Sequence, residues 1–304
     1  YVKEVQAGLH NWVVSFDLNS LYPHLIMQYN VSPDTILTGV TEPCRVDSLL
    51  HKEIDLNKYY DKDIIIAPNG QGFRKDVQGF LPRIMQEKYD NRVIFKKKMI
   101  EAKKKLEKAT DPDEIEKLKK EADSFGNKQT AMKLMLNSVY GAFGNPYFRF
   151  FDLRISEAIT LGGQLSIRWA ESVVNNYLNK VMETEEEDYV LASDTDSLYI
   201  TLGKLVEKVF PENPDPTKVI NFLDKVCEEK LQGVIDNGYA DLANYTNAFD
   251  QKMFMKRECL ADKGIWTGKK HYILNVHDNE GVRYTNPRLK VMGIESVKSS
   301  TPTS

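Results

Sequence analysis

Several features that would assign a protein to a specialised class are scarce or missing in this sequence. Its 304 residues contain only three cysteines, Cys44, Cys227 and Cys259, with neither a C-x-x-C pair nor a histidine at zinc-binding spacing. This pattern argues against a disulfide framework and against a structural zinc site. No apolar run is long enough to cross a bilayer, and the first residues do not resemble a signal peptide. We therefore expect a protein with reduced thiols in a cytosolic compartment.

A strong excess of either charge is also missing. The 41 basic and 44 acidic residues give a net charge of −3, which neither favours nor excludes a polyanionic partner. The length allows one large domain or two, with a hydrophobic content of 41% that is ordinary for a globular protein. Because the chain begins on polar residues and stops without a closing element, we expect a piece of something larger or a split-gene product.

Helices and strands mix in this sequence without the rhythm of repeated βαβ units. We expect strands at residues 12–18, 188–200 (a hairpin), 253–260, 271–276 and 282–284, and helices at 82–108, 114–140, 154–180 and 217–237. Residues 32–79 look irregular. The first two helices are separated by a helix stop and restart around Pro112, which predicts a long antiparallel helical hairpin. The predicted class is α+β, an antiparallel sheet with helices against one face.

An acidic turn, Asp194-Thr195-Asp196, lies between two short apolar segments. Carboxylates this close repel each other, so a cation would stabilise the turn, and oxygen ligands suit Mg²⁺. A surface turn rich in aspartate is the alternative. The metal interpretation is favoured by Asp17, which ends a second apolar strand far upstream. Two carboxylates on separate strands are what two-metal phosphoryl transfer needs.

Three further groups of residues could serve the same chemistry. Asp196 is either a ligand or a supporting neighbour, and Glu258 is either another ligand or an exposed strand residue. Two helical faces could bind phosphates and a base: Lys133, Asn137 and Tyr140 on one helix, and Arg92 and Lys96 on the other. A solvated basic helix is the alternative, and it fits most of the lysines from residue 97 to residue 108.

Three stretches in order resemble the motifs of family B DNA polymerases. Residues 15–23 (Ser-Phe-Asp-Leu-Asn-Ser-Leu-Tyr-Pro) resemble motif A, residues 133–141 (Lys-Leu-Met-Leu-Asn-Ser-Val-Tyr-Gly) motif B, and residues 193–197 (Ser-Asp-Thr-Asp-Ser) motif C. Residues 267–272 resemble the K-K-R-Y segment that grips primer-template. Residues 68–70, 149–154 and 298–302 are similar to the replicative polymerases of T-even-like bacteriophages.

The resemblance implies a DNA-directed DNA polymerase using two Mg²⁺ ions, with palm at residues 1–81 and 145–304 and fingers at 82–144. It implies primer-template DNA and dNTP as partners, exonuclease and thumb domains outside this chain, a sliding clamp bound through a C-terminal tail, and the cytoplasm of an infected bacterium as location. The catalytic residues would be Asp17, Asp194 and Asp196, with Asp17, Leu18 (by its carbonyl), Asp194 and Glu258 as metal ligands. The nucleotide would contact Ser20, Leu21, Tyr22, Arg92, Lys96, Lys133, Asn137 and Tyr140, and DNA would contact Gly141, Lys269, Lys270 and Tyr272.

Two departures from the family pattern put single contacts in doubt. Ala192-Ser193 stands where the family has Tyr-Gly, and His271 stands where it has arginine. A reverse transcriptase or RNA polymerase is disfavoured because it would carry adjacent aspartates. A non-catalytic module that binds primer-template DNA stays open as the alternative function.

Overall fold

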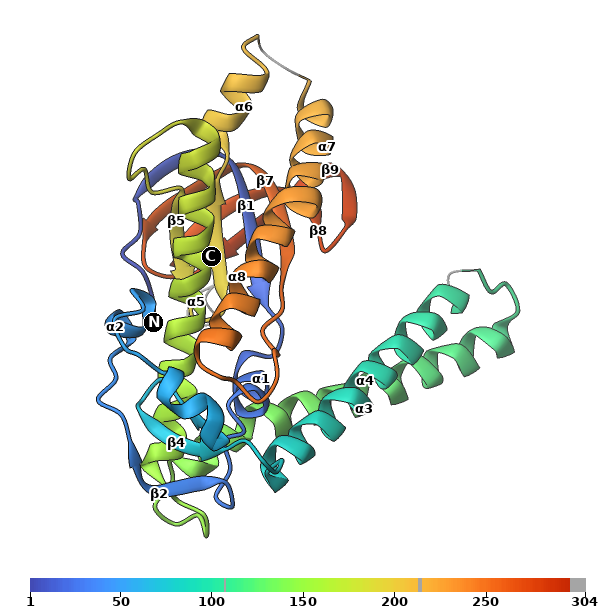
Figure 1. Ribbon diagram of the computed structural model, residues 1–304. Coiled ribbons are helices and arrows are strands. Elements are labelled where there is room, and N and C mark those ends of the chain that lie inside the picture. The colour runs from blue at the N-terminus through green and yellow to red at the C-terminus, as the bar shows by residue number, and fades with distance from the viewer. Residues whose placement is uncertain (107, 213–214, 296–304) are drawn as a thin grey trace. The chain divides into compact units, whose positions relative to one another are not determined.

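The computed structural model describes residues 1–106, 108–212 and 215–295 (Figure 1). Its chain divides into two compact units. The first unit comprises Tyr1–Leu21, Gly163–Tyr245 and the chain from Met253 onward, and the second comprises Tyr22–Gly162 and Thr246–Lys252. This division follows compactness and assigns no role to either unit. The three-part palm and fingers division therefore stays a prediction.

The first unit is built on a six-stranded antiparallel sheet with the strand order β5-β6-β1-β7-β8-β9. Its strands are β1 (Gly8–Leu18), β5 (Val190–Asp194), β6 (Ser197–Thr201), β7 (Met255–Gly268), β8 (His271–Asn279) and β9 (Val282–Met292). Val13, Val14 and Phe16 of β1 are fully buried. Since successive strand residues point to opposite faces, burial of both Val13 and Val14 shows that both faces of β1 are covered.

Helices accompany this sheet. They are α5 (Leu153–Met182), which begins in the second unit, α6 (Gly203–Val209), α7 (Pro216–Val226) and α8 (Gln232–Tyr245). Both α7 and α8 contact β7, and the Trp169 indole on α5 donates to the Gly238 carbonyl on α8 at 2.8 Å. The contacts of α7 and α8 with a central strand bury much of their apolar surface.

The second unit contains a three-stranded sheet with the order β2-β4-β3, formed by β2 (Ile36–Thr41), β3 (Ile64–Ile66) and β4 (Gln71–Arg74). It also contains α1 (Leu21–Gln28), of which Leu21 is counted with the first unit, α2 (Val46–Leu50) and the 3₁₀ helix η1 (Asn57–Lys62). The buried Asn30 amide donates to the carbonyls of Arg74 and Val77 at 2.7 and 2.8 Å. Side-chain hydrogen bonds of this kind have no sequence period, which is why the sequence did not predict this sheet.

Two long helices of the second unit, α3 (Phe80–Leu106) and α4 (Pro112–Phe143), lie side by side (Figure 1). The Asp111 side chain caps α4 by accepting from the Glu114 amide, and Pro112 occupies the first turn. Phe95 and Phe125 stack between the helices with ring centroids 6.4 Å apart. The lysines between residues 96 and 105 are exposed, which agrees with a solvated face.

The α+β class and the antiparallel sheet with flanking helices are confirmed. Several element boundaries were wrong. Strands β7, β8 and β9 extend beyond the predicted ranges, and the predicted helix at 217–237 is three segments, because a π-helical turn (Cys227–Leu231) separates α7 from α8. Residues 298–302, which contributed to the phage resemblance, lie outside the described residues. Among the helices described, none combines the length and apolar character that crossing a membrane would take.

Candidate active site

The acidic turn predicted from the sequence joins β5 to β6. Asp194 is the last residue of β5 and pairs with Ser197, so Thr195 and Asp196 alone form the connection. Thr195 adopts a left-handed conformation with φ of 56°, and the Asp196 amide donates to the Asp194 carbonyl at 2.6 Å across it, which makes a very tight turn. The Thr195 amide donates to the Tyr1 carbonyl at 3.0 Å, and the Lys3 amide donates to the Ser193 carbonyl at 3.2 Å. The first residues of the chain therefore hold the outer edge of the turn.

The register of the sheet places Asp17 beside this turn. Asp17 on β1 pairs with Ser197 on β6, and the Leu18 amide donates to the Asp196 carbonyl at 2.8 Å. On its other side β1 pairs with β7, the strand that bears Glu258. The acidic residues predicted from distant parts of the sequence thus reach neighbouring strands.

These carboxylates line one open pocket of about 400 Å³ within the first unit. Its lining consists of Asp17, Asp194, Thr195, Asp196, Ser197, Tyr199, Glu258, Lys270, Tyr272, Lys290 and Met292. Four carboxylates thus share the pocket with only two lysines, so negative charge predominates in it.

The electrostatics of the pocket follow from that imbalance. Burial, followed by repulsion from Asp196 and Glu258, raises the pKa of Asp17 to about 7, although the nearby Lys290 ammonium opposes the rise. Burial also raises the pKa of Asp196, with repulsion from Asp194 and Glu258 adding to it. A divalent cation would remove this repulsion, so the donors fit a hard metal ion.

The two lysines neutralise the other two carboxylates. The Lys290 ammonium lies 2.8 Å from Glu258, and the Lys270 ammonium lies 3.3 Å from Asp194. In the described part of the chain, neither Asp17 nor Asp196 forms an ion pair with a lysine or arginine. The geometry therefore couples Asp17 with Asp196 more directly than with Asp194, the aspartate that the sequence analysis named beside Asp17 as a metal ligand.

No three His, Cys, Asp or Glu side chains among the described residues gather closely enough to hold a metal by themselves. Two carboxylates are nevertheless sufficient for Mg²⁺, which usually takes one or two protein carboxylates and completes its octahedron with water and substrate phosphates. Asp17 and Asp196 fit that role. The roles predicted for Leu18, Asp194 and Glu258 as ligands stay predictions.

The segment at residues 267–272 forms the turn between β7 and β8. Lys269 and Lys270 are exposed, with Lys269 ion-paired to Glu4, and Lys270 adopts φ of 62°. Tyr272, by contrast, is only 8% exposed, and its hydroxyl is 2.7 Å from that of Tyr199. Tyr272 therefore packs mainly in the core, and only a small part of it lines the pocket and is open to a partner.

The other predicted residues lie on or beside α1, α3 and α4. Ser20, with φ of 46°, and Leu21 lie where β1 passes into α1. In the second unit, Tyr22 and Tyr140 are brought together, with ring centroids 4.9 Å apart. Lys96, Lys133 and Asn137 are exposed on α3 and α4, Arg92 is half-buried on α3, and Gly141 is exposed near the end of α4.

The sequence analysis missed Ser15 and Lys290. Ser15 is buried on β1, and its hydroxyl donates to Glu258 at 3.1 Å. Lys290 lies on the part of β9 beyond the predicted strand at 282–284, so its strand position was not foreseen. Only the full length of β9 shows that Lys290 lies on this strand and can reach Glu258.

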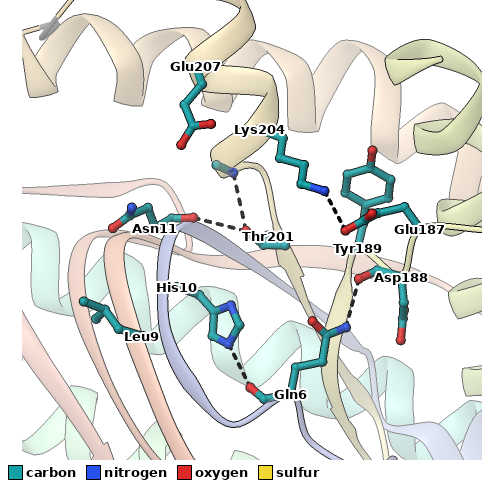
Figure 2. Close-up of a pocket in the computed structure, with 11 residues that line it drawn as sticks. Gln6, Leu9, His10, Asn11, Glu187, Asp188, Tyr189, Thr201, Lys204 and Glu207 are labelled. Carbon is teal, nitrogen blue, oxygen red and sulfur yellow. Dashed lines mark hydrogen bonds and ion pairs between the residues drawn. The ribbon is translucent and has the colours of Figure 1, made fainter. Parts of the chain in front are cut away.

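A second pocket of the first unit, of about 230 Å³, is lined by residues of the N-terminal segment and of the β5 and β6 region (Figure 2). The side chains that line it largely satisfy one another. Lys204 pairs with Glu187 at 2.8 Å, the Gln6 amide donates to the Asp188 carbonyl at 2.9 Å, and a His10 ring nitrogen lies 2.8 Å from the Gln6 carbonyl. This pocket gathers no set of uncompensated groups comparable to the carboxylates around Asp17.

Comparison with protein families matches residues 2–210 to DNA polymerase family B. A DNA-directed DNA polymerase of Escherichia phage RB69 is 38% identical, with 99% of this chain aligned to 38% of that protein. The DNA-directed DNA polymerase of Enterobacteria phage T4 is 34% identical over the same shares, and DNA polymerase 1 of Pyrococcus abyssi is 30% identical over 79% of this chain and 25% of the relative. The chain spans well under half the length of these curated relatives.

Proposed function

Because this chain belongs to DNA polymerase family B, we propose that it is part of a DNA-directed DNA polymerase that extends a primer on a template strand. The observation that carries the proposal is the carboxylate pocket, where Asp17 and Asp196 lie together without a cationic partner among the described residues. In the proposed reaction the primer 3′-oxygen bonds to the α-phosphorus of a dNTP. The bond from that phosphorus to the pyrophosphate oxygen breaks.

Asp17 and Asp196 would hold Mg²⁺ in this pocket, with Asp194 and the Leu18 carbonyl as further candidate ligands. Bound Mg²⁺ would lower the pKa of the attacking hydroxyl and stabilise charge on the phosphate oxygens. Lys270, exposed at the rim, would meet the DNA backbone together with Lys269. Contacts of this kind position a duplex without reading its sequence.

We propose palm roles for residues 1–81 and 145–304 and a fingers role for residues 82–144. On α3 and α4, phosphate binding is assigned to Arg92, Lys96, Lys133 and Asn137, with the backbone amides of Ser20 and Leu21 as further donors. Tyr140 and Gly141 would contact the nascent base pair. Action in DNA replication of a bacteriophage, inside the infected cell, accords with the phage relatives.

A primer-extension assay tests the proposal. The chain should add dNTPs to a primer only when a template and Mg²⁺ are present. A chimera in which residues 1–304 replace the matching segment of the RB69 relative supplies the parts that lie outside the aligned region. A chimera that binds primer-template in a gel shift but never extends it would favour the non-catalytic alternative.

Removing a cation from α4 should weaken nucleotide binding. Lys133 is exposed and shares a helical face with Asn137, so it is available to a triphosphate. A charge-assisted hydrogen bond contributes about 1.5–3 kcal/mol, so Lys133→Ala should lower kcat/KM for dNTP by about 10–150-fold. Steady-state kinetics measure the change. Lys120→Ala, on the same helix and paired only with Glu116, is the matched control, and equal kinetics for both variants would contradict the assignment.

Tyr22 should discriminate between sugars. Its ring packs against that of Tyr140, so it is a supported aromatic wall, and a 2′-hydroxyl placed against it would collide with the ring. Tyr22→Ala should raise rNTP use relative to dNTP use by at least the roughly 10–200-fold that an apolar pocket achieves per methylene. The ratio of kcat/KM values for the two sugars measures this effect. Tyr22→Phe keeps the ring and should keep the ratio, whereas an unchanged ratio in Tyr22→Ala with lowered stability would make Tyr22 a packing residue.

A further inference from the structure

Glu258 is held by two groups in the first unit. One of its carboxylate oxygens lies 2.8 Å from the Lys290 ammonium, and the other accepts a hydrogen bond of 3.1 Å from the Ser15 hydroxyl. Ser15 is fully buried, and the side chains of Glu258 and Lys290 are each 27% exposed. The carboxylate therefore already has a charge partner and a hydrogen-bond donor.

The strand order explains how these groups meet. Glu258 is on β7, Ser15 is on the adjacent strand β1, and Lys290 is on β9, with β8 between β7 and β9. Neighbouring strands are about 4.8 Å apart, so Lys290 reaches Glu258 only by extending its long side chain across β8. Glu258 is thus restrained from two directions within the sheet.

We propose that Lys290 is a positioning residue that restrains Glu258 from metal binding, so that Glu258 is not added to Asp17 and Asp196 as a ligand. This inference rests on the proposed function, because it assumes a metal at those two aspartates. Its basis is geometric: Lys290 and Ser15 engage the two oxygens of Glu258, while Asp17 and Asp196 have no such partner in the part of the chain described here.

A limited ligand set has a physical consequence. A third free carboxylate would raise the negative charge around the ion and occupy a coordination position that a substrate phosphate needs. Lys290 also places a positive charge in the same pocket, which opposes cation binding. Both effects keep the metal affinity of the protein without nucleotide low, so the nucleotide supplies much of the coordination.

Binding of Mn²⁺, followed by the electron paramagnetic resonance of the free ion, tests the proposal without any turnover. Lys290→Met removes the restraint and the charge, so Mn²⁺ should bind about tenfold more tightly than to the wild type. Lys290→Arg keeps the charge and should keep the wild-type affinity. Lys204→Met, which removes an exposed lysine from the pair with Glu187, is the matched control and should change nothing.

The double variant Lys290→Met/Glu258→Gln keeps the proposal testable if the single variant fails to fold, since it leaves no unpaired buried charge. Under the proposal it binds Mn²⁺ as the wild type does, because Glu258 is no ligand and the net charge is unchanged. A tenfold loss in the double variant, or unchanged or weaker binding in folded Lys290→Met, overturns the proposal. A wild-type protein that neither binds Mn²⁺ nor extends primers overturns the proposed function as well.

Discussion

Replacing Asp17 or Asp196 with asparagine should lower primer extension by about a thousandfold or more. Each change removes a carboxylate from the pair that forms no ion pair with a lysine or arginine in the described ranges. Metal stabilisation of a transition state is worth several kcal/mol. Single-turnover extension measures the chemical step, and a gel shift checks that primer-template binding is kept. Asp262→Asn, on β7 and outside the carboxylate pocket, is the control and should extend normally. Extension within tenfold of wild type in either site variant would refute the assignment.

The same Asp17→Asn substitution should stabilise the metal-free protein. The pKa of Asp17 is raised to about 7 in the folded state from its ordinary value of 3.8, so folding works against its ionisation. The unfolded chain releases this proton at lower pH, so the destabilisation is absent below pH 3.8 and complete above pH 7. Thermal melts at pH 8 should show a higher Tm for the variant, and melts at pH 4 should show little difference. An equal Tm at pH 8 would contradict the repulsion described above.

The second large effect is expected at Arg257, which should destabilise the fold when it is replaced by methionine. Its side chain is only 9% exposed and pairs at 2.5 Å with Asp278, which is 2% exposed, and at 3.0 Å with Asp224. Without Arg257, the buried Asp278 carboxylate keeps only a longer contact of 3.3 Å with the more exposed Arg283 guanidinium among the described residues. Breaking a buried pair costs up to about 3–5 kcal/mol. The Tm should fall by roughly 10 °C.

Arg74→Met provides the matched control for Arg257→Met. Arg74 also pairs with an aspartate, Asp76, at 2.6 Å, but their side chains are 45% and 44% exposed. Water screens an exposed pair, and the long side chains lose entropy when they pair, so this change should alter the Tm little. Equal losses in the two variants would mean that burial does not set the cost.

The sequence predicted the carboxylates because each ends or follows an apolar strand, a pattern that local alternation makes visible. It paired Asp17 with Asp194 and left Asp196 as either a ligand or a supporting neighbour, because the spacing does not show which aspartate lies nearer to Asp17. The structure supports Asp196, since the Leu18 amide next to Asp17 donates to the Asp196 carbonyl and Asp196 is the carboxylate that most strongly repels Asp17. The small sheet of the second unit was not predicted, for a different reason. Buried amides such as Asn30 hold its surroundings together, and their hydrogen-bond partners lie far away in sequence.

Tyr272 shows a limit of assigning contacts from a sequence motif. The segment around it resembles a DNA-binding segment, and its two lysines are exposed, yet Tyr272 itself packs against Trp266 with ring centroids 5.5 Å apart. A motif read from sequence does not separate the residue that faces a partner from the residue that supports it. Burial makes that distinction, because an aromatic ring at 8% exposure has little surface left to offer.

The pairing of the first residues with the acidic turn has a consequence for the order of folding. Thr195 and Ser193 bond to Tyr1 and Lys3, so the turn is completed by a contact between segments very distant along the chain. Closing so long a loop costs conformational entropy before the contact forms. Contacts between segments distant in sequence therefore generally slow folding. The β5–β6 hairpin can form locally and early. The hydrogen bonds at its outer edge form only after the N-terminal segment has docked beside it. The carboxylate pocket should therefore be among the last parts of the first unit to reach its final geometry.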